Sequence, residues 1–233
     1  MRIEVRADSG EPTEADVLAI PVGPEGVPEN AGVEAAARVA DEEGLAAEAG
    51  RTAVLYEGPA RRVVVVGMGP KEELDADTIR TAAAAVAEAA ENVGGTLAWR
   101  LDGSLAQPEE ARAVVDGLLL GTYDPGRWKA GASTEPPFDR LVLVGSDDAT
   151  LAETAERAAT IATAANRARD LANTGANELT PERLADRAAE LAGAHEDLTT
   201  EALGPEEVEK LGMGAFAGVA QGSHNPPRMI VLR

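Results

Sequence analysis

Cysteine is absent from the 233-residue sequence, and this absence removes several kinds of site at once. Disulfide bonds, thiolate metal ligands and cysteine nucleophiles are all excluded. Long apolar runs are also missing, since none approaches the roughly 20 residues that a membrane-spanning helix requires. The N-terminus, from Met1 to Asp8, carries charges where a signal peptide needs an apolar segment. These features predict a cytoplasmic protein without a membrane partner.

Positive charge is scarce. Lys and Arg number 21 against 41 Asp and Glu, which gives a formal net charge of −20. Such a surface repels phosphate backbones, so nucleic-acid binding would need a local basic patch. The nearest candidates, Arg61-Arg62 and Arg167 with Arg169, are short and are flanked by apolar or acidic residues. The sequence therefore predicts no nucleic-acid partner.

Lysine and aromatic residues are also rare. Lysine occurs only at Lys71, Lys129 and Lys210, and aromatics make up 3 % of the chain. Few lysines, many carboxylates and small apolar residues together favour a salt-adapted organism, in which counterions screen the repulsion between carboxylates. A coding bias toward Ala, Arg, Gly and Asp is the alternative. Salt adaptation would describe the habitat, and neither explanation identifies a function.

The apolar residues that are present predict an α/β domain over residues 1–150. Continuous apolar runs are typical of strands that are covered on both faces of a parallel sheet. Longer Ala-rich helical stretches lie between them, and Asp77 is the predicted N-cap of the second helix. The predicted strands are 17–22, 53–56, 63–66 and 141–144, and the predicted helices are 33–49, 78–91 and 108–120.

Residues 121–139 are rich in Gly and Pro and predict a loop, after which the pattern changes. Small residues recur at three- and four-residue intervals from Leu151, which predicts a long helix with one closely packing face. Thr180-Pro181 is typical of the start of a further helix, ending near Ala192. The remaining predictions are a short helix over 205–211 and a strand over 229–232. We interpret that last strand as cut off from its continuation, a natural edge strand being the alternative.

Three groups of residues carry side chains or spacings that can serve chemistry, and none indicates a site. Gly67-Met-Gly69 resembles a dinucleotide-binding turn, but Glu72 stands where the third glycine belongs and would repel a pyrophosphate. His195 and His224 are the only histidines, lie far apart, and are predicted to be solvated or in a turn. The acidic pairs are interpreted as solvated or first-turn acids: 42–43, 72–73, 109–110 and 206–207.

Four longer stretches resemble the leucyl aminopeptidase (cytosol aminopeptidase, peptidase M17) family, in that family's order. They cover nearly the whole chain, and the last two are the most specific. They are Val66-Gly-Met-Gly-Pro-Lys-Glu-Glu-Leu74, Asp116-Gly-Leu-Leu-Leu-Gly-Thr-Tyr123 with Arg127-Trp-Lys129, Arg169 to Pro181, and Leu211 to Arg228.

The resemblance implies a two-part molecule. It predicts a macro-like N-terminal domain (1–150), a connecting helix (151–172) and the beginning of an α/β catalytic domain (173–233). Family members are typically hexamers that remove N-terminal residues, often leucine, from peptides. They use two divalent metals, zinc or manganese, to activate a water molecule.

The family's ligand motifs are missing from this sequence. A valine-glycine-lysine-glycine motif and a later asparagine-threonine-aspartate-alanine-glutamate-glycine-arginine motif supply the metal ligands in the family, and both follow the counterpart of Met229–Leu232. We therefore assign no catalytic, cofactor-binding or metal-binding residue, and we expect the chain alone to bind no metal and to be inactive. Residues 173–177 and 212–222 are expected at most to support such a site. The alternative is a non-catalytic module that binds a ligand through Gly67–Glu73 or regulates oligomers.

Overall fold

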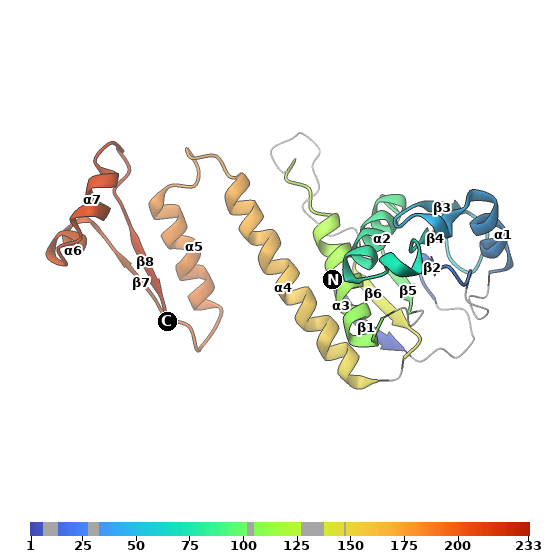
Figure 1. Ribbon diagram of the computed structural model, residues 1–233. Helices are drawn as coiled ribbons and strands as arrows, with labels where there is room; N and C mark the ends of the chain where they lie inside the picture. The colour runs from blue at the N-terminus through green and yellow to red at the C-terminus, as the bar shows by residue number, and fades with distance from the viewer. Residues whose placement is uncertain (7–13, 28–32, 102–104, 127–137, 147) are drawn as a thin grey trace. The chain divides into compact units, whose positions relative to one another are not determined.

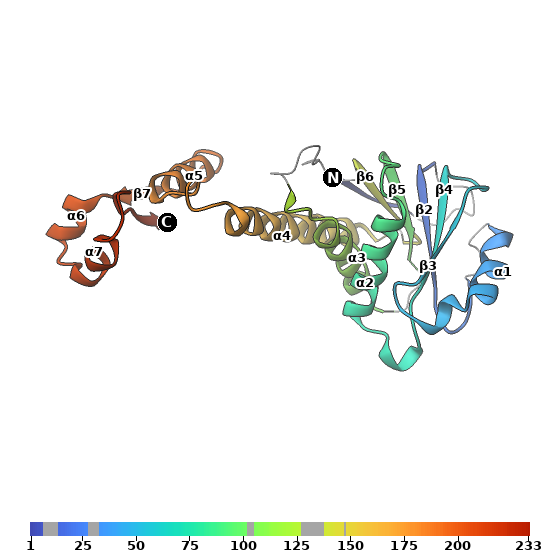
Figure 2. The ribbon, with the colours of Figure 1, turned by 90° about the horizontal axis from the view of Figure 1, so that it is seen from above.

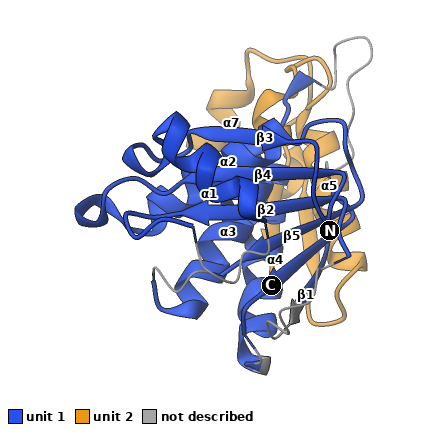
Figure 3. Cartoon of the chain, turned by 90° about the vertical axis from the view of Figure 1, so that its right-hand side faces the viewer, with its two compact units in different colours: residues 1–168 blue, residues 169–233 orange. Residues whose placement is uncertain are grey.

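The computed structural model describes residues 1–6, 14–27, 33–101, 105–126, 138–146 and 148–233. The chain divides into two compact units, Met1–Ala168 and Arg169–Arg233, which are coloured separately in Figure 3. The predicted segment 127–129 and most of the predicted loop 121–139 lie outside the described residues. The three-part division into 1–150, 151–172 and 173–233 stays a prediction.

Unit 1 is built on a six-stranded sheet, and this confirms the predicted α/β class with a largely parallel sheet (Figure 1). The order is β1-β6-β5-β2-β4-β3, and only the β3–β4 pair is antiparallel. The strands are β1 (Arg2–Arg6), β2 (Val17–Val22), β3 (Thr52–Leu55), β4 (Arg62–Gly67), β5 (Thr96–Arg100) and β6 (Arg140–Val144).

Helices cover both faces of this sheet, as Figure 2 shows. One face carries α1 (Glu34–Glu43), and the other carries α2 (Ala76–Ala89), α3 (Gln107–Gly121) and the first part of α4 (Ala149–Asn173). Val63 to Val66 of β4 are fully buried because alternate side chains enter the two cores. The continuous apolar run of the sequence is thereby explained.

Helices α2 and α3 approach each other closely because glycine and alanine line their contact. A Cβ atom added at Gly117 would lie 2.4 Å from the Arg80 carbonyl oxygen and 2.8 Å from the Ala83 Cβ. One added at Gly121 would lie 2.5 Å from the Ala84 Cβ. These distances are too short for any side chain, so the two glycines set the spacing of the helices.

Helix α4 packs its small residues inward, as its sequence pattern predicted. Leu151, Ala155, Ala158 and Ala162 are buried. Ala165, which continues the same spacing, is exposed. Further along, the Asn166 side-chain amide donates a hydrogen bond of 2.8 Å to the Leu119 carbonyl near the end of α3. This bond satisfies one of the carbonyl groups that the last turn of α3 leaves without a helical partner.

Helix α2 begins at Ala76, two residues earlier than predicted, and its N-cap is Asp75 instead of Asp77. Asp75 Oδ1 accepts hydrogen bonds of 2.9 Å from the backbone N–H groups of Asp77 and Thr78. The Thr78 hydroxyl in turn accepts a long bond of 3.4 Å from the Asp75 N–H, which completes a capping box. The prediction failed because two acids compete here, and only Asp75 has Thr78 at the position that closes the box.

We expect the charged Asp75 cap to make the stability of unit 1 decrease at low pH. The Thr78 backbone N–H and hydroxyl, followed by the Asp77 N–H and Arg80, hold the pKa of Asp75 below its ordinary 3.8. A lowered folded-state pKa means that the carboxylate stabilises the fold above the unfolded pKa, and that this stabilisation disappears as pH falls through the folded value. Asp75→Asn keeps an acceptor but not the charge.

Thermal melts from about pH 6 to about pH 3 test this expectation. Wild type should melt above Asp75→Asn at the upper end, and the gap should narrow toward the lower end as the Asp75 carboxylate becomes protonated. Asp77→Asn is the control, because it changes an 84 % exposed carboxylate that does not cap the helix. A gap that stays constant with pH would contradict the assignment.

Unit 2 consists of short elements around a two-stranded antiparallel sheet. Thr180 caps α5 as predicted, with its side chain accepting from the Arg183 N–H at 3.3 Å. The Glu182 and Arg228 side chains form a 3.8 Å ion pair that links the start of α5 to the segment before the last strand. The elements are α5 (Pro181–Gly193), β7 (Thr200–Leu203), α6 (Pro205–Lys210), α7 (Gly214–Ala220) and β8 (Met229–Leu232).

Candidate functional site

The carboxyl ends of the parallel strands are where an α/β sheet ordinarily binds ligands. The β4–α2 connection, Gly67–Glu73, lies at this edge next to the end of β2, since the Met68 N–H donates to the Val22 carbonyl at 2.9 Å. It continues into a short 3₁₀ helix, Lys71–Glu73. The alternative hypothesis, a non-catalytic module, predicts that a ligand binds to this connection.

The geometry of Gly67 shows why glycine stands there. A Cβ atom at Gly67 would lie 1.9 Å from the Leu45 carbonyl oxygen and 2.4 Å from the Glu48 carbonyl oxygen. The chain thus needs glycine for a close backbone approach within the protein and not for an approach to phosphate. The interpretation of Gly67-Met-Gly69 as a structural turn is consistent with this packing.

The charges around this connection also disfavour a phosphate ligand. Lys71 is its only cation, and its ammonium already lies 3.7 Å from the Glu25 carboxylate. Glu72 and Glu73 follow at once and are exposed. An anion placed here would meet three carboxylates against one shared ammonium group.

A second polar cluster lies where β6 ends and α3 and α4 begin. The buried Ser146 hydroxyl donates to the Gln107 side-chain oxygen at 2.9 Å and accepts from the Asp148 N–H at 3.2 Å. Asp148 Oδ1 accepts from the Thr150 hydroxyl and N–H, both at 2.8 Å, and these bonds lower the pKa of Asp148. These bonds connect the start of α3 to the start of α4.

The acidic pair 109–110 lies in the first turn of α3, as the first-turn interpretation predicts, but its two members differ in burial. Glu110 is 2 % exposed. Its neighbour Glu109 is exposed, as are the pairs 42–43, 72–73 and 206–207. The two differ because adjacent helical residues lie about 100° apart around the axis, so one can be buried while the other faces water.

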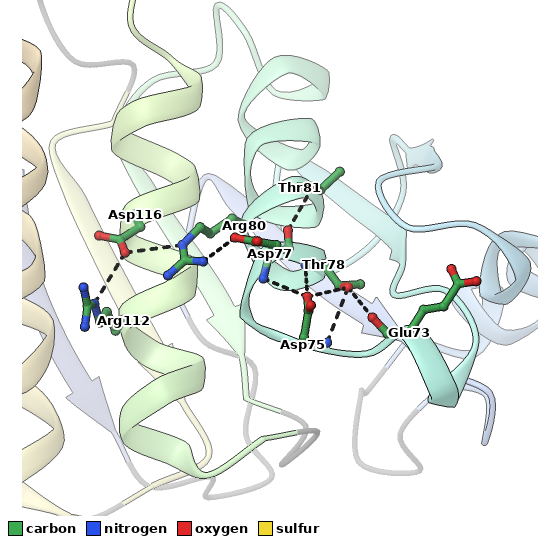
Figure 4. Close-up of polar contacts among 8 residues, drawn as sticks. All are labelled: Glu73, Asp75, Asp77, Thr78, Arg80, Thr81, Arg112 and Asp116. Carbon is green, nitrogen blue, oxygen red and sulfur yellow. Dashed lines mark hydrogen bonds and ion pairs between the residues drawn. The ribbon is translucent and has the colours of Figure 1, made fainter.

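Charged residues also meet on the outer side of α2 and α3 (Figure 4). The Asp116 carboxylate, whose side chain is 11 % exposed, lies 3.5 Å from Arg80 Nε and 3.6 Å from Arg112 Nε. Arg80 also pairs with Asp77. Asp116 belongs to one of the stretches that resemble the family. Its ion pair with Arg80 shows a structural role, because it links α3 to α2.

We expect Asp116→Ala to lower the free energy of unfolding by about 1–3 kcal/mol, because two arginines lose a largely buried partner. Urea denaturation of unit 1 measures this change. Asp77→Ala removes an exposed carboxylate that pairs with the same Arg80, and should cost less than about 1 kcal/mol. Equal losses in the two variants would mean that the burial of Asp116 contributes nothing.

Both histidines are exposed, at the end of α5 and in the turn before β8, and they lie in separate parts of unit 2. Across the described ranges, no three His, Asp or Glu side chains form a group suited to a metal ion. The described helices also include none that is long and apolar enough to cross a membrane.

The turn after α4 is held by its own hydrogen bonds. The Asn173 amide donates to the Arg169 carbonyl at 2.9 Å, and the Thr174 hydroxyl donates to the Asp170 carbonyl at 2.7 Å. The Glu178 and Leu179 N–H groups both donate to the Gly175 carbonyl at 2.9 Å. These contacts fix the shape of residues 173–179, and its supporting role toward a metal site stays a prediction.

Comparison with known proteins relates both units to one family. Residues 27–132 match the N-terminal domain of the cytosol aminopeptidase family, and residues 166–233 match its catalytic domain. A probable cytosol aminopeptidase of Roseiflexus castenholzii is 39 % identical over 75 % of this chain and 37 % of its own length. One of Solibacter usitatus is 37 % identical over 81 % of this chain and 40 % of its own length.

Solved structures agree with the sequence relatives. The bottromycin maturation enzyme BotP in complex with Mn is 30 % identical, with a TM-score of 0.75, over 94 % of this chain and 45 % of its own. A tomato leucine aminopeptidase mutant, 22 % identical, shares the fold with a TM-score of 0.82 over 100 % of this chain and 50 % of its own. The chain spans half or less of the length of these relatives, and it belongs to the cytosol aminopeptidase (M17) family.

Proposed function

We propose that this chain forms the N-terminal part of a leucyl-aminopeptidase-type exopeptidase, which removes N-terminal residues from peptides. One observation carries the proposal: the two domain models of the family match this chain in succession, the N-terminal domain at 27–132 and the catalytic domain at 166–233. The same succession supports a macro-like domain over 1–150, a connecting helix over 151–172 and the start of the catalytic domain over 173–233.

The chemistry belongs to residues outside this chain in our proposal. Two divalent metals, manganese or zinc, would polarise the scissile carbonyl and activate water in the intact enzyme. BotP in complex with Mn supports manganese as one choice. The residues described here do not fit such a dimetal site, because they include no group of three possible ligands. We therefore assign them no catalytic step, and their role is to fold and position the domain that carries the site.

The biological setting follows from the same assignment. We propose a peptide substrate, a cytoplasmic location and a homo-oligomer, a hexamer if the chain behaves like the family it resembles. The net charge of −20 supports the absence of a nucleic-acid partner and is compatible with a salt-adapted source. No contact in the described residues favours the oligomer-regulating alternative.

Peptidase activity should appear only when the catalytic domain is extended. The test compares this chain with a chimera in which the remaining catalytic segment of the Roseiflexus castenholzii relative follows Arg233. With leucine anilide and added manganese, the chimera should show a kcat/KM at least about 1,000-fold higher, since metal-activated water supplies most of the rate. A chelator should abolish that difference.

Two results would contradict the proposal. One is turnover by the 233-residue chain together with stoichiometric uptake of two metal ions. The other is a folded, metal-loaded chimera that cleaves no amino-terminal residue from any peptide in a mixed-sequence library.

A further inference from the structure

Strand β3 ends the six-stranded sheet of unit 1, and its ladder with β4 fixes which of its backbone groups face outward (Figure 3). The Gly67 N–H donates to the Arg51 carbonyl, so that carbonyl points toward β4. Because backbone groups alternate between the two sides of an antiparallel strand, the N–H and C=O groups of Thr52 and Val54 point away from β4. Within the described ranges, no residue bonds to these outward groups.

The two edges of this sheet differ in how they are protected. Edge strands ordinarily carry charges, proline or a bulge that hinders pairing with another chain. At the opposite edge, β1 has charged residues at alternate positions, Arg2, Glu4 and Arg6. Strand β3 reads Thr-Ala-Val-Leu, without a charge or a proline, and its β-branched residues favour pairing. The β3 edge can therefore accept an additional strand.

We propose that β3 pairs with β3 of a second copy of this chain, antiparallel and about a two-fold axis at Ala53. This register places Thr52 opposite Val54 of the second copy, and Val54 opposite Thr52. Each of these pairs exchanges two N–H···O=C bonds, so every outward group of both residues finds a partner. Ala53 meets its own counterpart, and its small side chain leaves room for the approach. The contact uses unit 1 alone and does not depend on the proposed peptidase function.

The charges beside β3 are complementary in this arrangement, although each whole chain carries −20. Arg51 precedes the strand and the exposed Glu57 follows it by two residues. An antiparallel pairing brings the positive start of each β3 beside the acidic end of the other. Arg51 is now 3.7 Å from Glu43 in a pair whose side chains are both about half exposed, and such a pair contributes little. The two Arg51 residues would be four positions apart, about 13 Å along the strands, which is beyond the screening distance of about 8 Å.

Tyr56 adds an exposed aromatic side chain to this edge. It is 74 % exposed directly after β3, and its ring centroid lies 5.6 Å from the guanidinium carbon of Arg62. The proposed register aligns position 56 with position 50 of the second copy, where glycine has no side chain to exclude the ring. Tyrosine is among the residues that contribute most to protein interfaces. A second copy would thus cover an aromatic group that is left in water in the single chain.

Amide exchange measured residue by residue tests the pairing on the 233-residue chain. Between about 20 μM and about 1 mM protein, the Thr52 and Val54 amides should slow at least about tenfold, because dimerisation covers them. The Ala53 and Leu55 amides should change far less, since their bonds to β4 already exist in the monomer. Sedimentation should show a monomer–dimer equilibrium, which added salt strengthens by screening the repulsion between two acidic chains.

Two pairs of variants locate the contact. Val54→Pro removes the outward N–H without removing a bond to β4, and should raise the dimer dissociation constant at least about tenfold. Val54→Ala is its control, because it keeps that N–H, and should change the constant less than about threefold. Where proline disturbs folding, Tyr56→Ser replaces it and should also weaken the dimer. Ile161→Ser, at a 50 % exposed residue of α4, should leave the dimer intact.

Three outcomes would overturn the inference. The first is a monomer at every concentration and salt, which would leave the β3 edge free. The second is slow exchange of Thr52 and Val54 at every concentration, which would mean that the chain covers this edge itself. The third is a dimer in which these two amides do not slow, or which neither Val54→Pro nor Tyr56→Ser weakens, because its contact would then lie elsewhere.

Discussion

Replacing Gly67 with alanine is expected to lower the free energy of unfolding of unit 1 by about 3 kcal/mol or more. The added methyl group would lie 1.9 Å from one backbone oxygen and 2.4 Å from another, those of Leu45 and Glu48. Backbone cannot rotate away as a side chain can, so the strand end itself must move.

That movement would also strain the hydrogen bonds that hold the strand end. The Gly67 N–H donates to the Arg51 carbonyl at 2.8 Å, and the Gly67 carbonyl accepts from the Gly50 N–H at 2.9 Å. Guanidinium denaturation measures the loss. Gly23→Ala is the control at the same edge of the sheet, because a Cβ atom there meets nothing within 4 Å. If the two variants lose the same stability, the close approach at Gly67 is not the cause.

Replacing Trp99 with alanine should cost about 3–5 kcal/mol, the range for removing a large aromatic side chain from a core. Trp99 of β5 is fully buried in the core that faces α2, α3 and α4. Its removal would leave a cavity that these helices, already in contact through Gly117 and Ala83, can fill only in part.

Trp99→Phe separates ring packing from polarity. The Trp99 indole nitrogen is buried and has no hydrogen-bond partner among the residues that the structure describes. Phenylalanine keeps much of the volume and removes a polar group that costs free energy when it is unpaired, so the loss should stay below about 2 kcal/mol. Urea unfolding of both variants gives the comparison. A loss for Trp99→Phe as large as that for alanine would contradict this account.

Strands with continuous apolar runs were the most predictable part of the fold. The bounds of β2 and β8 agree with the sequence, and β4 and β6 extend the predicted runs by one or two residues. Strands β1, β5 and β7 were missed. Arg2–Arg6 alternates charged and apolar residues, and its charges were interpreted only as evidence against a signal peptide. In β5 and β7 the apolar run is too short to stand out, and pairing with neighbours decides the structure.

Polar residues were harder to place because their burial depends on partners distant in the chain. The sequence could not show that Asp116 meets Arg80 of another helix, or that Glu110 is buried while Glu109 is exposed. Nor could it show that Gly67 packs against the backbone at residues 45–48. The short helix α7 (Gly214–Ala220) was missed too, because its glycines favour a turn.

The close contact between α2 and α3 limits what the alanine content of the sequence can say about the organism's habitat. Where Gly117 and Gly121 meet Ala83 and Ala84, the space admits no larger residue, whatever the salt of the medium or the base content of the genome. Alanine at these sites is therefore uninformative about the environment. Any inference about habitat has to be drawn from solvent-facing positions, where selection and mutation are free of this steric limit.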